Sequence, residues 1–368
     1  MYDKLLIKLL QSTHPCSLRQ YLPQKKNDWD TLIDQAFRNR MAYTLFHYLT
    51  CSRCDMSRSK MIGKLRTLYV YEQTRSFHYK KMVRRLKYLV RKNRIPIVFL
   101  KDFSEYETHF SEANKFMKFD IDILVKTNYE KKLSTLLREI GYVPQKKPTG
   151  WPNLPQEYYT QTKWNHFRNL RAPQVEVRTS AITIPPSKLT LLSKQQISII
   201  SQELWRHAKK DKDGTFRFQL SYLYLYHCLI FALEDGFRGL NNLYRLWIIG
   251  KELNQKEWRM VLRILSDYQI DQLILLITDR LQEVFGQMSI PKRIFKQTWE
   301  INIAHHLFTL KFIGYVPLHS GRKSYSHWES NYRTFLLSAL VIQKPLWWKT
   351  LFFLHPKRLF FLVAFLMK

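Results

Sequence analysis

The most constraining feature of the chain is a short apolar segment that carries two aspartates: Phe119, Asp120, Ile121, Asp122, Ile123, Leu124 and Val125. Residues i and i+2 of a β-strand point to the same face, so Asp120 and Asp122 are expected to project together from a strand whose other face is apolar. Two converging carboxylates repel each other unless a cation or a proton lies between them. The pattern therefore favours a site for a hard divalent cation such as Mg²⁺ or Mn²⁺. The open alternative is that both aspartates lie on a solvated strand face.

The bulk composition indicates a globular protein with a strongly basic surface. The chain has 368 residues, 45% of them hydrophobic, which suffices for two domains and excludes a disordered chain. Only 10 residues are glycine, which favours helices over turn-rich β architecture. Lys and Arg total 60 against 29 Asp and Glu, a net charge of +31. Such a charge attracts nucleic acid, nucleotides, phosphorylated sugars or acidic lipids, although it also serves solubility alone.

The cysteines and the apolar segments bear on localisation. Cys51 and Cys54 have the spacing of half a zinc site, but no second pair follows, so we expect reduced thiols and no disulfides. The first ten residues are too short and too charged for a signal peptide, and no apolar run has transmembrane length. We expect a cytoplasmic protein, with peripheral attachment at the inner membrane face as the alternative. Residues 345–368 suit either an interfacial anchor or a helix packed on the protein.

Periodicity divides the chain into a helical beginning, an α/β middle and a helical remainder. Residues 1–94 are predicted to be helical, ending in a long basic amphipathic helix from Ser57 to Asn93. The predicted elements of residues 95–186 are strands at 97–100, 119–125, 142–143, 157–164 and 174–179, and a helix at 129–140 capped by Gly141. Residues 187–344 are predicted to hold helices at 188–208, 216–235, 240–253, 256–267, 269–285 and 292–313. The tail is 345–368.

Two further segments complete the pattern around the aspartates. Leu100 and Lys101 end the strand before them, and Gln174 to Thr179 alternates so that Val175 and Val177 would face the core. Glu176 and Arg178 would then share the other face of that strand. For Glu176, the alternative to a site carboxylate is an exposed residue that pairs with Arg178.

These motifs, in this order, resemble the bacterial family of uncharacterised nucleotidyltransferases, which belongs to the DNA polymerase β-like superfamily and is often associated with polysaccharide biosynthesis genes. The resemblance rests on Leu100-Lys101, the Asp120 to Val125 strand, Gly141-Tyr142 and Val175-Glu176-Val177. It covers roughly residues 60–250. It implies an α+β fold, in which a small mixed β-sheet nucleotidyltransferase core is flanked by an N-terminal helical segment and a larger C-terminal helical domain.

The resemblance also implies an activity and a set of site residues. It implies an Mg²⁺- or Mn²⁺-dependent transfer of a nucleoside monophosphate from an NTP to an unknown acceptor. Asp120, Asp122 and Glu176 would be the catalytic, metal-binding carboxylates. We also predict that Lys101, just past a strand end, and Arg178 contact substrate phosphate; the open alternative for Lys101 is an ordinary surface lysine. The sequence departs from the family where Asp102 replaces the glycine after Leu-Lys and where Arg178 replaces a histidine.

Two other functions remain open at this stage. The first is a catalytically decayed nucleotidyltransferase-like protein that binds nucleic acid or an anionic membrane through its basic surface; the charge and Asp102 favour it. The second is a metal-dependent glycosyltransferase, which uses an Asp-x-Asp motif with the same local carboxylate chemistry. A glycosyltransferase would normally carry a Rossmann-like series of strands and helices before the motif, where this chain has a long basic helix.

Overall fold

The computed structural model describes ten stretches of the chain, which include parts of the predicted core and of both predicted helical parts. The stretches are 6–8, 22–39, 41–51, 62–101, 120–145, 161–167, 172–182, 194–234, 239–268 and 270–286. Phe119, Asp102, the helix predicted at 292–313 and the tail at 345–368 lie outside the described residues.

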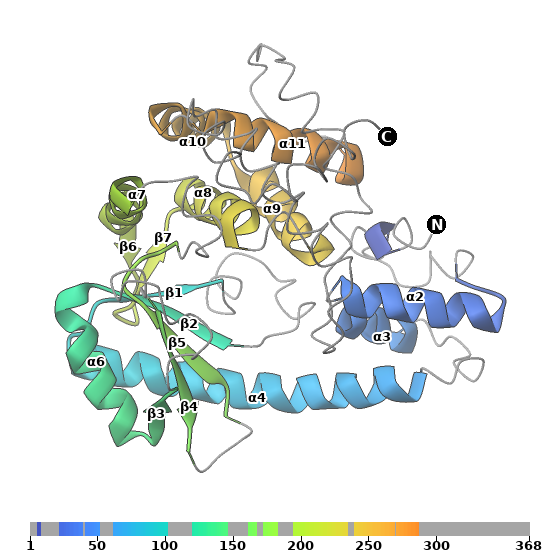
Figure 1. Ribbon diagram of the computed structural model, residues 1–368, viewed down its shortest axis with the longest axis horizontal. Coiled ribbons are helices and arrows are strands. Elements are labelled where there is room, and N and C mark those ends of the chain that lie inside the picture. The colour runs from blue at the N-terminus through green and yellow to red at the C-terminus, as the bar shows by residue number, and fades with distance from the viewer. Residues whose placement is uncertain are drawn as a thin grey trace, which may run out of the picture.

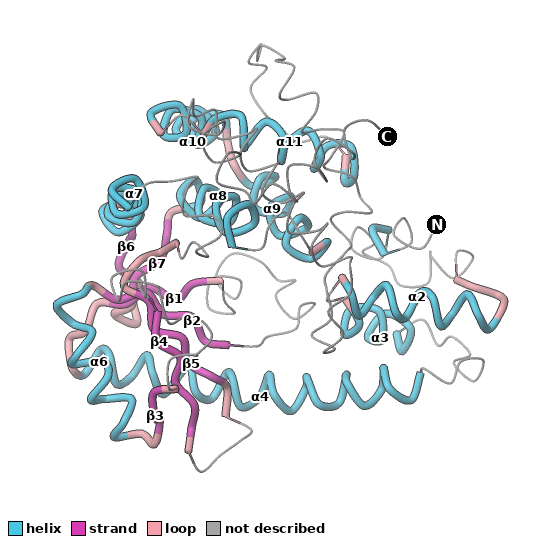
Figure 2. Tube along the Cα trace, viewed as in Figure 1, coloured by secondary structure: helices cyan, strands magenta, loops and turns pink. Residues whose placement is uncertain are grey.

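Within the described residues the strands form one mixed sheet of seven, in the order β3-β4-β5-β2-β1-β7-β6, which lies in the left part of the view (Figures 1 and 2). The strands are β1 (Ile97–Leu100), β2 (Asp120–Val125), β3 (Tyr142–Pro144), β4 (Gln161–His166), β5 (Gln174–Arg178), β6 (Ala208–Lys210) and β7 (Phe216–Phe218). β2 pairs antiparallel with β1 and parallel with β5. The α+β class and the small mixed sheet expected from the sequence are confirmed.

The two faces of the sheet belong to two different hydrophobic cores, as period-2 alternation requires. In β1, Ile97 and Phe99 join the core that is closed by α4 (Ile62–Lys92) and α6 (Thr127–Glu139). Val98 and Leu100 join the second core, which the C-terminal helices cover. In β2, Ile121, Ile123 and Val125 likewise face α4 and α6, whereas Leu124 faces the C-terminal helices. Asp120 and Asp122 share the face of Leu124 and so point toward the helical part.

Helix α4 runs along one side of the sheet and extends well past it (Figure 1). Its far half packs against α3 (Ala42–Cys51), which follows α2 (Lys26–Arg38). The helix is continuous over its 31 residues. It ends in a left-handed residue, Arg94 (φ 52°), and the amide of Ile95 bonds back to the carbonyl of Val90. This is the hydrogen-bonding pattern of a Schellman C-cap, and Pro96 prevents continuation.

The C-terminal helices are α7 (Lys194–Arg206), α8 (Leu220–Leu229), α9 (Leu240–Glu252), α10 (Gln255–Asp267) and α11 (Asp271–Phe285). A π-helical turn, η5 (Ile230–Glu234), directly continues α8. The helices predicted at 240–253, 256–267 and 269–285 are confirmed.

The helix predicted at 216–235 is wrong at its beginning. Phe216–Phe218 forms strand β7, which pairs with β6 and with Val98 of β1. The two strands form a hairpin whose turn contains Gly214 in the left-handed region (φ 86°), and the sheet gains two strands there. A strand of three residues shows too little alternation of apolar and polar side chains to be distinguished, in the sequence, from the helical pattern that follows it.

Candidate active site

The register of the sheet brings two of the predicted carboxylates face to face. In the parallel pairing of β2 with β5, Asp122 lies opposite Glu176 and Asp120 lies opposite Gln174. Asp122 and Glu176 are buried, with exposed fractions of 8% and 4%. The solvated-face alternative is therefore wrong for Asp122. For Glu176 the expected exposure is wrong, but the expected pairing with Arg178 is present.

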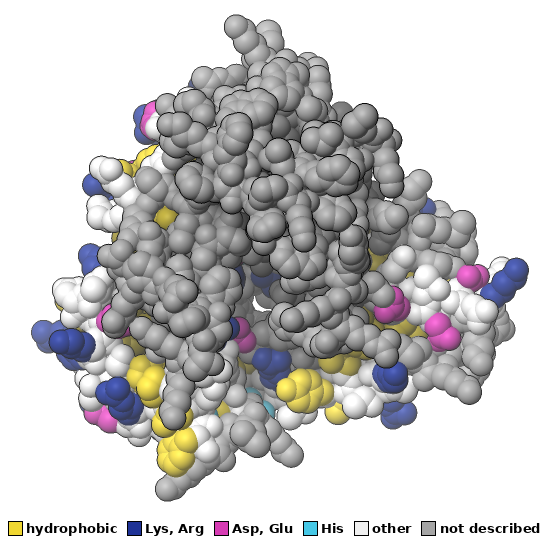
Figure 3. Space-filling model, in the orientation of Figure 1, with side chains coloured by type: hydrophobic (Ala, Val, Ile, Leu, Met, Phe, Trp, Pro, Cys, Tyr) yellow, Lys and Arg dark blue, Asp and Glu magenta, His cyan; other side chains and the backbone are white. Residues whose placement is uncertain are grey.

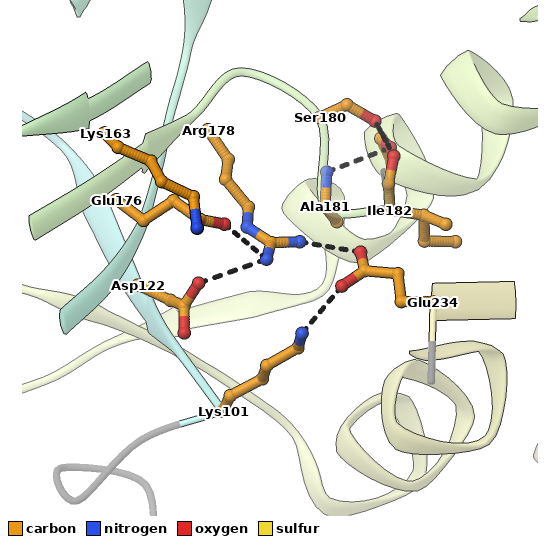
Figure 4. Close-up of polar contacts among 10 residues, drawn as sticks. Lys101, Asp122, Lys163, Glu176, Arg178, Ser180, Ala181, Ile182 and Glu234 are labelled. Atoms are coloured by element: carbon orange, nitrogen blue, oxygen red, sulfur yellow. Dashed lines mark hydrogen bonds and ion pairs between the residues drawn. The ribbon is translucent and has the colours of Figure 1, made fainter. Parts of the chain in front are cut away.

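Arg178 lies at the centre of this buried group of charges (Figure 4). Its Nη2 is 3.1 Å from Asp122 Oδ1 and 2.5 Å from Glu176 Oε1, and its Nη1 is 2.6 Å from Glu234 Oε1. Lys163 of β4 approaches the other oxygen of Glu176 at 3.4 Å. One guanidinium group thus contacts three carboxylates that would otherwise repel one another at low dielectric, and Lys101 and Lys163 add further positive charge.

Lys101 follows β1 directly and takes an unusual backbone conformation. Its φ is 55°, in the left-handed region that favours glycine. Its Nζ donates to Glu234 Oε2 at 2.6 Å. The predicted site residues Lys101, Asp122, Glu176 and Arg178 therefore belong to one network, which Glu234 completes.

The pKa values of the carboxylates diverge because their surroundings differ. Burial raises the pKa of Asp122 to about 7, although the positive charges of Arg178 and Lys101 oppose this shift. Burial also acts to raise the pKa of Glu176, but Arg178, Lys163 and Lys101 together outweigh it, and that pKa is lowered. Burial raises the pKa of Asp120 as well, with the nearby Glu176 adding to the shift. Asp122 is thus the group of the site that exchanges its proton near neutral pH.

The donor atoms suit a hard cation. Glu176 Oε1 is buried and lies 2.5 Å from Arg178 Nη2. This contact is an ion pair without the alignment of a hydrogen bond, and Oε1 accepts no hydrogen bond from the residues that the structure describes. Carboxylate oxygens are the ligands that Mg²⁺ takes from proteins, usually one or two of them, with water and substrate phosphate completing the shell. Within the described stretches, no three His, Cys, Asp or Glu side chains form a metal-binding group by themselves. Phosphate oxygens would therefore have to supply further ligands.

Two members of the network were not predicted from the sequence, Lys163 and Glu234. Glu234 lies 133 positions after its partner Lys101, so local spacing carries no sign of the contact. The sequence carried one signal for the residue, though not for its contacts: Glu234 follows a mostly hydrophobic run from Ser221 to Leu233 in a chain that has few acidic residues.

Comparison with known proteins agrees with this geometry. A family model described as "Uncharacterised nucleotidyltransferase" matches residues 25–286, more than two thirds of the chain. The chain belongs to this nucleotidyltransferase family. No curated protein and no solved structure matches the chain. Membership in the family implies an NTP substrate and transferase chemistry.

The family match and the sheet both bear on the glycosyltransferase alternative. The strand before the two aspartates, β1, pairs antiparallel with β2, and the sheet is mixed. A Rossmann-like domain would instead present a parallel series of strands with helices between them. Neither observation favours a nucleotide-sugar site.

None of the described helices is long and apolar enough to cross a membrane.

Proposed function

We propose that this protein is an Mg²⁺- or Mn²⁺-dependent nucleotidyltransferase that transfers a nucleoside monophosphate from an NTP to an acceptor of unknown identity. The observation that carries the proposal is the pairing of Asp122 with Glu176 across β2 and β5, with Asp120 on the same strand face as Asp122. In such a reaction an acceptor hydroxyl attacks the α-phosphorus and loses its proton to solvent, a new P–O bond forms, and pyrophosphate leaves with the electron pair of the broken P–O bond.

Asp120, Asp122 and Glu176 would hold the metal together with phosphate oxygens of the substrate, since no three such side chains of the described residues form a metal-binding group by themselves. A divalent ion supplies charge stabilisation for the attacking and leaving oxygens of an in-line displacement. The protein's contribution is to fix the carboxylates on two hydrogen-bonded strands, which restrains them more tightly than a loop would. Glu176 Oε1 contacts Arg178 Nη2 at 2.5 Å, so Glu176 would ligate a cation through this oxygen only after the guanidinium group moves away. Asp122 must lose its proton before it can ligate, and its pKa of about 7 makes this step sensitive to pH.

Lys101 and Arg178 would contact phosphate, with unequal access. The side chain of Lys101 is 22% exposed, whereas that of Arg178 is 5% exposed and contacts three carboxylates. Lys101 therefore has the better access to a triphosphate. Arg178 would reach a phosphate oxygen only by giving up one of its carboxylate partners, and until then it holds those carboxylates in place.

Calorimetry with substituted proteins tests the assignment. Wild type should bind at least one NTP in the presence of Mg²⁺ or Mn²⁺ and should lose this binding in EDTA. Asp120→Ala, and separately Asp122→Asn, should abolish the metal-dependent binding while the protein stays folded by circular dichroism. Asp213→Asn is the matched control, because it removes a carboxylate that pairs with Lys87 outside the site. Unchanged metal-dependent binding in the folded Asp120→Ala protein would overturn the metal-site assignment.

The acceptor can be sought with the same protein. Incubation with each α-labelled NTP and either metal should place label on protein, on RNA or on a small molecule from a lysate. The label should be lost with Asp122→Asn and kept with Asp213→Asn. Label that persists in the Asp122→Asn protein would assign the transfer to other residues.

Helix α4 favours a second function, the binding of nucleic acid or an anionic membrane. Its solvent-facing side carries seven exposed basic residues: Lys64, Arg66, Lys81, Arg84, Arg85, Arg91 and Lys92. Tyr71, Phe77 and Tyr88 lie among them and are 57%, 66% and 64% exposed. In Figure 3 the Lys and Arg side chains along the lower part of the view, where α4 runs in Figure 1, have hydrophobic side chains between them. Aromatic side chains interleaved with cations can stack nucleic-acid bases while neighbouring cations contact phosphates.

Salt dependence and vesicles separate the two partners of this second function. If α4 binds nucleic acid, affinity for a single-stranded oligonucleotide should fall steeply with salt, and Phe77→Ala should weaken it. Flotation with vesicles that contain anionic lipid, with and without residues 345–368, tests the membrane. If the protein binds neither oligonucleotide nor vesicle at low salt, the basic face serves solubility only.

A further inference from the structure

Glu234 reaches the site from the helical part of the chain. It is the last residue of the π-helical turn η5, which continues α8 after Leu229. Single π-helical turns within α-helices occur frequently at functional sites, because the extra residue per turn redirects the side chains that follow. The four residues before Glu234 are buried and apolar, and Glu234 itself is 11% exposed. A buried carboxylate at the end of an apolar turn requires cationic partners.

Each oxygen of the Glu234 carboxylate accepts from a different cation. Oε1 accepts from Arg178 Nη1 at 2.6 Å, and Oε2 accepts from Lys101 Nζ at 2.6 Å. The two cations come from separate strands, since Arg178 ends β5 and Lys101 follows β1. Figure 4 shows Glu234 facing both, on the opposite side of the Arg178 guanidinium from Asp122 and Glu176.

The two cations need such a partner for different reasons. Lys101 has a flexible side chain with a compact charge, so without an anchor its ammonium group would sample many positions. Its backbone is already held in the left-handed region, so the direction of its side chain depends on tertiary contacts. The guanidinium group of Arg178 contacts Asp122 and Glu176 through Nη2, and Glu234 holds the other terminal nitrogen, Nη1.

We propose that Glu234 is a positioning residue of the nucleotidyl-transfer site, which holds Lys101 for the triphosphate and Arg178 for the metal-binding carboxylates. This inference rests on the proposed function for the role of Lys101, although the contact itself does not depend on it. The sheet and the helical part would then both contribute to the site, because the carboxylate of Glu234 comes from η5 and orders two cations, Lys101 and Arg178, that come from the sheet.

The negative charge of Glu234 and its role as an anchor for Lys101 predict opposite effects on NTP binding when Glu234 is replaced, so the positioning role can be tested. A negative charge beside a phosphate site repels the substrate, so loss of the charge alone would tighten NTP binding. Loss of the anchor would instead release Lys101 and weaken binding. Glu234→Gln removes the charge with little change of shape, and its amide nitrogen cannot accept from an ammonium group. We expect the positional effect to prevail and NTP binding to weaken about tenfold, since hydrogen bonds between charged groups are among the stronger ones.

A second readout follows the lysine directly and needs no nucleotide. Acylation of individual lysines by a small amine-reactive probe, read by mass spectrometry, should be several times faster at Lys101 in Glu234→Gln than in wild type. Lys87 is the internal reference, because its ion pair with Asp213 at 2.7 Å is untouched. Glu203→Gln is the matched protein control, since each oxygen of Glu203 also contacts one basic side chain, Arg206 or His207, outside the site.

The outcomes separate this inference from the proposed function. Faster acylation of Lys101 together with weaker NTP binding supports both. Unchanged acylation of Lys101, or NTP binding that is unchanged or tighter in folded Glu234→Gln, overturns the positioning role. If wild type binds no NTP with either metal, the proposed function fails, and the acylation result still decides whether Glu234 holds Lys101. Should Glu234→Gln fail to fold, Glu234→Asp retains the charge but shortens the reach by one methylene, and the same two measurements apply.

Discussion

Asp122 and Glu176 face each other across β2 and β5, yet the two carboxylates differ in protonation near neutral pH. Burial raises the pKa of Asp122 to about 7, while the cations around Glu176 lower the pKa of that side chain. Burial is the largest cause of the shift at Asp122, whereas at Glu176 the charges of Arg178 and of Lys163, which contacts Glu176, lower the pKa. Near neutral pH the site thus holds a charged Glu176 carboxylate beside the titrating carboxyl group of Asp122.

The pH dependence of stability should reveal the buried Asp122. Its pKa is raised from 3.8 in the unfolded chain to about 7 in the folded protein, so between these values the unfolded state has released a proton that the folded state retains. The free energy of unfolding of wild type should therefore fall, relative to Asp122→Asn, as pH rises from about 4 to about 7, and the difference should then stay constant. Urea denaturation of both proteins across this range measures it. A difference that does not change with pH would contradict the raised pKa.

The same titration should control metal-dependent nucleotide binding. Only the deprotonated form of Asp122 can ligate a cation, so NTP affinity in the presence of Mg²⁺ should rise with pH through about 7 and then level off. Calorimetry at several pH values gives the profile. Affinity that falls over this range would place the titrating group elsewhere.

Arg178 should be the residue of the network whose loss is most destabilising. Its removal leaves the buried carboxylates of Asp122 and Glu176 and the partly buried carboxylate of Glu234 without their shared cation. We expect Arg178→Met to lower the free energy of unfolding by roughly 3–5 kcal/mol, the cost typical of breaking a buried ion pair. Arg206→Met is the control, because that side chain is 71% exposed and its pair with Glu203 should contribute about 1 kcal/mol or less. Equal losses in the two proteins would mean that the buried ion pairs do not form.

The backbone of Lys101 can be tested separately from its charge. Lys101→Gly and Lys101→Ala both lose the ion pair with Glu234, but only glycine is relaxed at a φ of 55°. We expect the glycine protein to be the more stable of the two by about 1 kcal/mol. Thermal or urea denaturation compares them, and a more stable alanine protein would show that this residue is not left-handed.

Gly141 offers a local test of the core. It ends α6 with a φ of 92°, and a Cβ there would lie 2.9 Å from His166 Nε2. Gly141→Ala should therefore cost about 1–2 kcal/mol of stability through backbone strain and the close contact. Gly63→Ala is the control, because Gly63 lies in α4 with nothing near its added Cβ, so that change should be neutral or stabilising by up to about 1 kcal/mol. Equal effects at both positions would contradict the assigned turn.

The sequence was sufficient for those parts of the site that local alternation determines. Asp120 and Asp122 on one strand face, and Glu176 with Arg178 on another, follow from a period of two, and both strands are present. The burial of Glu176 and Arg178 was not predictable. The alternation places them on the strand face opposite Val175 and Val177, but it does not show that a second core covers that face. Glu234 and Lys163 could not be predicted, since their contacts depend on tertiary packing across distant elements.

The fold shows a similar division. Long periodic segments such as α4 and α9 to α11 were predicted near their observed limits, whereas the three-residue strands β6 and β7 were not. Those strands add to the sheet beside β1 only because Val98 offers a free edge to Phe216. The division into domains at 94, 186 and 344 and the roles of the site residues stay predictions.

Helix α4 contributes to both hydrophobic cores with different parts of one rigid rod. Leu65 packs in the core that includes α2, α3 and the C-terminal helices, whereas Tyr79, Leu86 and Val90 pack against the sheet. Leu65 and Leu86 are about 32 Å apart along an α-helix that has no break between them. If the packing of one core is lost, α4 loses its contacts at one end, and this destabilises the packing of the other core against the same helix. The two cores should therefore melt as one cooperative unit.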